Sequence, residues 1–327
     1  MDIEALTADS GALPEVSAVL NAVAAHDTPW VHPETPASLG GFMRHGWDGE
    51  PPRWFAAREN GAVVGTAELH TSDWDNTHLA WLGISVHPDL RGAGRGSELL
   101  DFALDQARAA GRTSAGANGW ESPAVTAFAT RHRFECRSQA INRRQYVDHL
   151  DRGMLKQLHA DGEAAAAAYE LVRIDGRTQD DLLDAVVTMT AAINDAPTDD
   201  LEIEDEVFTP ARVRAYEEAT LGRGERLHRL VARHRETGEL AGHTVVAVEE
   251  ERPQIGYQHD TSVVRAHRGH RLGLLLKTAM LEWLAEVEPQ LQTVDTWNTE
   301  SNDHMIAVND ALGYRVMGRE LQFQRSI

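Results

Sequence analysis

The chain has 327 residues, of which 42% are hydrophobic, so it is long enough to form two cores of ordinary domain size. Its formal net charge of -20 disfavours nucleic acid and anionic membranes as partners, because both carry negative charge themselves. The single cysteine, Cys136, excludes an internal disulfide and any metal centre built from several thiolates, and it fits a reducing cytoplasm.

In chain order, the first residues lack the basic start and the apolar core of a signal peptide, and no run approaches the roughly 18 apolar residues of a membrane span. We therefore expect a cytoplasmic protein without a membrane anchor. An apolar helix is followed by a hairpin around Asn60-Gly61, an apolar strand over 81–86, a turn of glycine and arginine, and a long helix over 94–110. A further strand and a final helix complete a first domain, which we place at residues 1–150.

The next segment favours a helical connector over a flexible linker, because residues 148–168 include five consecutive alanines and no proline. We assign residues 151–168 to this connector. The same order of elements then recurs over residues 169–327, with a polar strand over 256–263 and a long helix over 272–286.

The second domain repeats the first at a nearly constant spacing, which indicates a duplication. The segment 58–65 reads like 235–242, and 86–92 reads like 263–269, so the offset at both places is 177 positions, as from Arg58 to Arg235. Beyond the long helix the offset is 180, as from Asn118 to Asn298, so a short insertion follows the long helix of the second copy.

The turn before the long helix of the first copy is the most informative motif. Its residues are Arg91, Gly92, Ala93, Gly94, Arg95 and Gly96. Amide groups at a helix N-terminus have no partner within the helix and lie at the positive end of its dipole, so they bind phosphate oxygens. No Gly-Lys-Ser/Thr follows, which excludes a Walker loop, and the glycine spacing fits a dinucleotide fingerprint poorly. The residues alone leave a tight turn without a ligand as the alternative.

The full pattern, Arg-x-x-Gly-x-Gly after a strand that ends in valine, resembles the pyrophosphate-binding signature of the GCN5-related N-acetyltransferase (GNAT) superfamily. Arg91, Gly94 and Gly96 fill its three specified positions. In the second copy Arg268 and Gly273 match, whereas Arg271 replaces the middle glycine and adds a cation near the phosphates.

The resemblance covers both copies and implies an α/β (α+β) fold of two tandem GNAT-like domains, each a mixed, mostly antiparallel twisted sheet flanked by helices. The tandem plan is similar to that of mycothiol synthase, in which the second domain carries the chemistry.

The resemblance also implies acetyl-CoA as the acyl donor and no metal. The CoA pyrophosphate would lie on the turn, and the end of the preceding strand would meet the pantetheine arm. In the first copy the implied residues are Val86, Arg91, Gly92, Ala93, Gly94, Arg95 and Gly96. In the second copy they are Val263, Val264, Arg268, Gly269, His270, Arg271, Leu272, Gly273 and Asn302, the last of which matches a helix-start asparagine that contacts the CoA arm.

In this family a β-bulge and the splay of two strands hold the thioester carbonyl, and a tyrosine of the final helix usually protonates the leaving thiolate. The tyrosine position holds Ala129 in the first copy and Asn309 in the second, and neither can replace a phenol. The strand over 256–263 is unusually polar for the centre of a sheet. Alternation predicts that one face carries Tyr257, His259, Thr261 and Val263 and that the other carries Gln258 and Asp260.

His259 is the candidate base, because an imidazole can take a proton from an ammonium near neutral pH. A hydrogen-bonded structural histidine is the alternative. Tyr257 and Asn309 complete the catalytic candidates, and Asn298 and Glu300, just past the next strand, are candidates for substrate contacts. On these grounds we expect the chemistry in the second copy; catalysis in the first copy remains the alternative, because its glycine turn is the better match.

The expected reaction is transfer of an acetyl group from acetyl-CoA to a primary amine of a small molecule. The acidic stretch over 199–206 lies where the fold places its acceptor-covering loop and would suit a cationic amine; a merely solvated segment is the alternative. Two other functions stay open. One is a non-catalytic acyl-CoA-binding or sensor protein, because the tyrosine is missing from both copies. The other is a protein acetyltransferase, which needs an open groove for a peptide. Fold alone does not identify the acceptor.

Overall fold

The computed structural model describes residues 1–327, which form two compact units. Unit 1 consists of Met1–Ala140, Thr198–Asp205 and Gly318–Ile327, and unit 2 consists of Ile141–Pro197 and Glu206–Met317. Unit 1 thus takes in two segments that the sequence analysis placed in the second copy. None of the helices combines the length and the apolar character needed to span a membrane.

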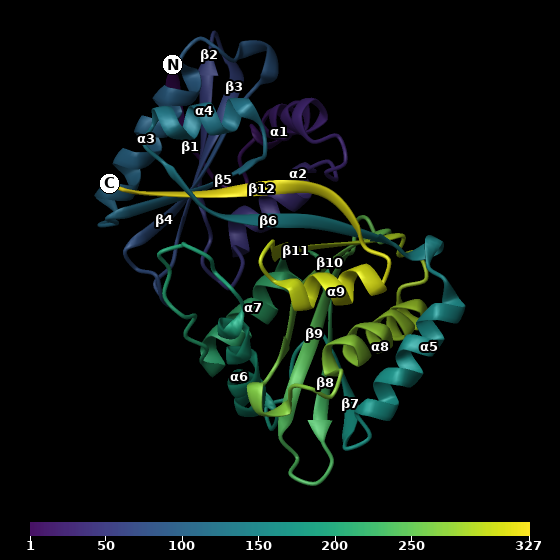
Figure 1. The fold of residues 1–327 in the computed structure, drawn as a ribbon. Helices are drawn as coiled ribbons and strands as arrows, with labels where there is room; N and C mark the ends of the chain where they lie inside the picture. The colour runs from purple at the N-terminus through teal and green to yellow at the C-terminus, as the bar shows by residue number, and fades with distance from the viewer. The chain divides into compact units, whose positions relative to one another are not determined.

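Unit 1 is a mixed sheet with helices on both faces (Figure 1). Across the sheet its strands are β1 (Asp2–Leu6), β2 (Arg53–Glu59), β3 (Ala62–Thr71), β4 (Leu79–Val86), β5 (Ser114–Trp120) and the end of β12 (Arg315–Ser326). The pairing of β4 with β5 is parallel, and the other pairings are antiparallel. The helices are α1 (Leu13–Asp27), α2 (Pro36–His45), α3 (Arg95–Ala109) and α4 (Pro123–Arg131).

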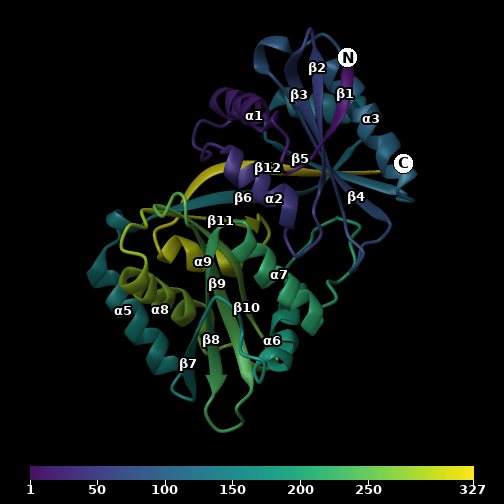
Figure 2. The same cartoon turned by 180° about the vertical axis from the view of Figure 1, so that it is seen from behind.

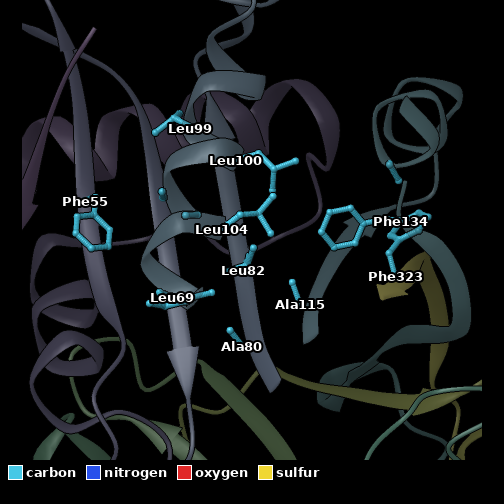
Figure 3. Close-up of a cluster of buried hydrophobic side chains, with 14 of the residues drawn as sticks. Phe55, Leu69, Ala80, Leu82, Leu99, Leu100, Leu104, Ala115, Phe134 and Phe323 are labelled. Atoms are coloured by element: carbon cyan, nitrogen blue, oxygen red, sulfur yellow. The ribbon is translucent and has the colours of Figure 1, made fainter. Parts of the chain in front are cut away.

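The alternation of side chains along β2 explains why helices cover both faces of this sheet. Phe55 packs in a core with α3, which contributes Leu99, Leu100 and Leu104 (Figure 3), whereas Trp54 packs with α1 and α2. Neighbouring residues of a strand point to opposite faces, so each face of β2 needs its own cover. The apolar stripe predicted for the long helix of the first copy is confirmed as the core side of α3.

Unit 2 has the same plan, seen from two opposite sides in Figures 1 and 2. Across the sheet its strands are the end of β6 (Glu135–Tyr146), then β11 (Thr293–Thr299), β10 (Ile255–Val263), β9 (Leu240–Glu249), β8 (Glu225–His234) and β7 (Tyr169–Asp175). Helices α5 (Arg152–Ala165), α8 (Leu272–Val287) and α9 (Asp303–Ala311) lie over one face, and α6 (Leu183–Thr190) and α7 (Pro210–Gly222) lie over the other.

The last strands of the two copies are exchanged. β6 follows α4 in the chain, but from Ile141 onward it belongs to unit 2. β12 ends the second copy, but Leu321 and Phe323 pair with β5 and enter the core of unit 1, where Figure 3 shows Phe323 near Phe134. Each unit is therefore completed by the terminal strand of the other copy.

Candidate functional site

Two strand-to-helix turns have the same backbone form in the two units. The residue that precedes α3 is Gly94 and the residue that precedes α8 is Arg271, and both are left-handed, with φ of 85° and 52°. Neither helix is capped by a side chain, whereas α4 and α9 are capped by Ser122 and Asn302. The first amides of α3 and α8 are therefore not engaged by a capping side chain and can receive an anion.

Neither turn is crowded. A Cβ atom added at Gly92, Gly94, Gly269 or Gly273 would meet no heavy atom within 4 Å. The φ angles of Gly92 and Gly269 are 82° and 87°, a conformation that suits glycine because other residues rarely adopt it. The residues of both turns thus fit the pyrophosphate of CoA, and binding itself stays a prediction.

The two arginines of the unit 1 turn are held by carboxylates of the protein. Arg91 donates to both oxygens of Asp27, at 2.9 and 2.7 Å, and to the carbonyl oxygen of Val86 at 3.1 Å. Arg95 donates to both oxygens of Glu59, at 2.9 and 2.6 Å. These contacts fix the turn to the end of β4 and compensate both charges.

The unit 2 turn repeats one of these arrangements and lacks the other. Arg268 donates to the carbonyl oxygen of Val263 at 3.1 Å and to Asp195 at 2.7 Å. In unit 1, Arg91 makes the corresponding contacts with Val86 and Asp27. Arg271 is 60% exposed, and its guanidinium is 4.0 Å from the carboxylate of Asp161. A contact at that length between exposed groups compensates little charge. The turn of unit 2 therefore carries an exposed cation whose charge is little compensated.

β10 contains a β-bulge that β4 lacks. The register against β9 shifts between Gln258 and Thr261, so that His259 and Asp260 together stand opposite Val245. β4 pairs with β3 without any shift. The parallel pairing of β10 with β11 ends just before the bulge, so the two strands separate beyond it.

The bulge shows that the predicted alternation along this strand is wrong. Gln258 Nε2 donates to Thr244 Oγ1 at 3.0 Å, and Thr261 Oγ1 is hydrogen-bonded to the same hydroxyl at 2.8 Å. Gln258 and Thr261 therefore share a face, and Val263, two residues on, lies on that face too. The extra residue reverses the alternation, so Thr261 and Val263 are not on the face of Tyr257.

The two bulge residues lie toward α7. His259 Nδ1 is hydrogen-bonded to the hydroxyl of Tyr216 at 2.5 Å, and burial lowers the pKa of His259 to about 3. An imidazole with that pKa is neutral but a weak base near neutral pH. Burial raises the pKa of Asp260, while the charge of Arg229 opposes the rise. Burial thus favours a proton on the Asp260 carboxylate and disfavours one on the His259 imidazole. The polar strand was the only sequence signal for Asp260.

Asn309, predicted at the tyrosine position, lies in a polar chain of side chains. Its Oδ1 accepts a hydrogen bond from Lys277 Nζ at 2.7 Å, and its Nδ2 donates to Asn298 Oδ1 at 3.3 Å. Lys277 is 3% exposed, and burial lowers its pKa to about 7. Lys277 was not predicted as a site residue, because a lysine in a helix is ordinarily solvated. The signal was its alignment with Leu100 in the apolar stripe of α3.

The remaining predicted residues have structural partners or places. Tyr257 donates from its hydroxyl to Glu249 at 3.0 Å, and Asn302 Oδ1 accepts from the amide of Met305 at 3.1 Å as the cap of α9. Glu300 is half-buried after β11. Residues 199–205 of the acidic segment belong to unit 1, where Glu204 accepts a hydrogen bond from the amide of Asn76 at 3.0 Å. No group of three or more histidine, cysteine, aspartate or glutamate side chains forms a metal-binding cluster.

Comparison with known proteins agrees with the repeated turn and the duplicated fold. Residues 20–123 and 191–314 match the Acetyltransferase (GNAT) family, once in each copy. The chain therefore belongs to the GNAT acetyltransferase family, and the predicted tandem of two GNAT domains is confirmed.

Two solved structures illustrate the likeness. A tandem GNAT protein from the clavulanic acid biosynthesis pathway is 28% identical, with a TM-score of 0.81 over 99% of this chain and 98% of its own. A GCN5-related N-acetyltransferase from Sphaerobacter thermophilus shows the same fold at 16% identity, with a TM-score of 0.67 over 99% and 95% of the two chains. No curated protein matches this chain.

Proposed function

We propose that this protein transfers an acetyl group from acetyl-CoA to a primary amine of a small molecule, and that unit 2 performs the reaction. The observation that carries the assignment is the bulge at His259 and Asp260, next to the separation of β10 from β11. The family resemblance gives a bulge and a splay the task of holding the thioester carbonyl. β4 has no bulge, so unit 1 lacks one of these two elements.

The turn of unit 2 supports binding of the donor. Acetyl-CoA supplies an acyl group activated as a thioester. The amides of Leu272 and Gly273 would bind its pyrophosphate, and Arg271 would add a positive charge that the exposed contact with Asp161 compensates only a little. The end of β10 at Val263 would meet the pantetheine arm, as the resemblance implies.

The residues at the bulge support proton removal from the acceptor. Asp260 would accept a proton from the ammonium of the acceptor, which leaves the free amine that attacks the thioester, because burial raises the pKa of its carboxyl. His259 would position the bulge through its hydrogen bond with Tyr216, and it remains the second candidate for the base. Asn298, near the end of β11, and Glu300, just after that strand, stay the proposed substrate contacts.

A second function is supported for unit 1. Its turn has open glycines at Gly92 and Gly94, yet its arginines are paired with carboxylates and β4 has no bulge. Unit 1 therefore suits a scaffold or a non-catalytic acyl-CoA-binding domain better than a second active site.

The experiment measures release of the CoA thiol from acetyl-CoA in the presence of small primary amines, with polyamines and amino sugars as the first set. Gly273→Trp should abolish release, and the matched variant Gly94→Trp should leave it. Loss of release in Gly94→Trp alone would move the reaction to unit 1. Binding of acetyl-CoA by calorimetry without release by any amine would favour the sensor function instead.

A further inference from the structure

Unit 2 holds a buried cation that has no carboxylate partner. Lys277 Nζ is 2.7 Å from Asn309 Oδ1 and 4.6 Å from the centre of the Tyr314 ring, and the side chain is 3% exposed. These two contacts are a hydrogen bond to a neutral carboxamide and a cation–π contact. Burial of a charge with only such partners is unfavourable, so its presence calls for an explanation beyond packing.

The duplication shows that the fold does not need this cation. At the offsets of 177 and 180 positions, the counterparts of Lys277, Asn309 and Tyr314 are Leu100, Ala129 and Phe134. All three counterparts are buried in the apolar core of unit 1. The same backbone is therefore packed in unit 1 without any polar group at these places.

The charged groups around Lys277 leave its ammonium uncompensated. Asp310 of α9 and Asp295 of β11 are each paired with an arginine of β6. His159 of α5 is hydrogen-bonded to the residue that follows Lys277 in α8. Tyr314 presents its ring, and burial raises the pKa of its hydroxyl, so it is neutral. No carboxylate is thus left to neutralise the ammonium.

The contact with Lys277 fixes the orientation of Asn309. An ammonium only donates, so the oxygen of the Asn309 carboxamide faces Lys277 and its nitrogen faces Asn298. Asn298 lies near the end of β11, past the point where β10 and β11 separate. The N–H end of the carboxamide is therefore directed to the end of β11, with the positive charge behind it.

We propose that Lys277 and Asn309 together replace the absent tyrosine, with the ammonium polarising the carboxamide so that its N–H group stabilises the negative charge on the leaving sulfur. As the bond from the amine nitrogen to the acyl carbon forms, the carbon–sulfur bond breaks and its electron pair leaves with sulfur. The proton of the amine passes to the base, so Lys277 itself need not give up a proton. Lys277 is a positioning residue, because it acts through Asn309. The inference rests on the proposed function of unit 2.

The test uses binding, so it does not depend on turnover. Calorimetry compares CoA with desulfo-CoA, which lacks the thiol, on the full chain between about pH 6 and pH 9. In the parent protein CoA should bind about tenfold more tightly than desulfo-CoA once the bound thiol ionises, because the Asn309 N–H group favours the thiolate. Lys277→Met and Asn309→Ala should lose that preference, with the affinity for desulfo-CoA unchanged.

Leu100→Met is the matched control in unit 1 and should keep the preference for CoA. The pair Lys277→Leu with Asn309→Ala copies the packing of unit 1, so it provides a folded variant if a single change does not fold. An equal preference for CoA in the parent and in Lys277→Met would overturn the inference and leave the proposed function standing. Failure of the parent to bind either ligand would overturn both.

Discussion

The buried ammonium of Lys277 predicts a stability effect that needs no ligand. Burial lowers its pKa from 10.5 to about 7, so the unfolded chain binds this proton more tightly than the folded protein does. The cost of the charge to the folded state therefore grows as pH falls from about 10.5 to about 7 and stays constant below that. The full difference between the two pKa values corresponds to roughly 5 kcal/mol, which is an upper limit for a single buried group.

Lys277→Met removes this cost, because methionine is uncharged and of similar length. The change also leaves Asn309 Oδ1 without its donor, which costs about 1–3 kcal/mol at every pH. The difference in unfolding free energy, variant minus parent, should therefore rise by about 3 kcal/mol between about pH 9.5 and pH 7. The pH-dependent part isolates the charge from the lost hydrogen bond.

Urea denaturation followed by circular dichroism at the two pH values measures this difference. Leu100→Met changes the equivalent helix position in unit 1 and should give a difference that does not vary with pH. A pH-independent difference for Lys277→Met would refute the reasoning, because it would mean that the ammonium is solvated or compensated in the folded protein.

Three further predictions concern the base, the phosphate site and the exchanged strand. Asp260→Asn should lower kcat by about a hundredfold with little change in KM, and His259→Gln should lower kcat less. The kcat of the parent should fall as pH falls through the raised pKa of Asp260. Equal losses of kcat in the two variants would contradict the assignment of Asp260 as the base. Arg271→Ala should weaken acetyl-CoA binding about fivefold by calorimetry, and an unchanged affinity would remove this cation from the site. Phe323→Ala should cost about 3–5 kcal/mol of stability in urea denaturation, and a loss near zero would show that β12 is not part of the unit 1 core.

The parts of the fold that the sequence predicted are those set by short-range chemistry. The hairpin at Asn60-Gly61 and the glycine turn before α3 depend on backbone conformations that neighbouring residues determine. The apolar stripe of α3 depends on helical spacing within one element. Because each of these signals occurs twice in the same order, the duplication and the tandem fold could be predicted from the sequence.

The bulge could not be found by comparing the two copies, because a second change hides it. Leu82 pairs with Leu69 and Gln258 pairs with Val246, so at this point the offset between the copies is 176 positions (82 to 258). After the bulge the offset is 177 again, as from Val86 to Val263. The connection before β10 is one residue shorter than its counterpart, and this deletion cancels the extra residue. Only the hydrogen-bond register distinguishes the two strands.

The exchange of terminal strands was also beyond the local pattern. Leu321 and Phe323 of β12 alternate as any half-buried strand does, and this pattern fits either sheet equally well. The choice is made by the core that receives them, which in unit 1 includes Phe134. The sheet that β12 joins is therefore determined by tertiary packing and cannot be predicted from the residues of the strand alone.

The contrast between the copies separates what the fold needs from what the reaction needs. Three positions differ. At the turn, Gly94 of unit 1 corresponds to the cation Arg271; in the strand, Gly83 corresponds to the bulge of His259 and Asp260; and in the long helix, Leu100 corresponds to the buried ammonium of Lys277. Unit 1 forms the same sheet and the same turn without them, so none of the three is a requirement of folding. One of them, Lys277, lowers stability near neutral pH, because burial lowers its pKa below the value in the unfolded chain. Unit 2 alone gathers polar groups that the fold does not require, at the turn, the bulge and the tyrosine position. This contrast is the strongest support for the proposal that unit 2 performs the acyl transfer.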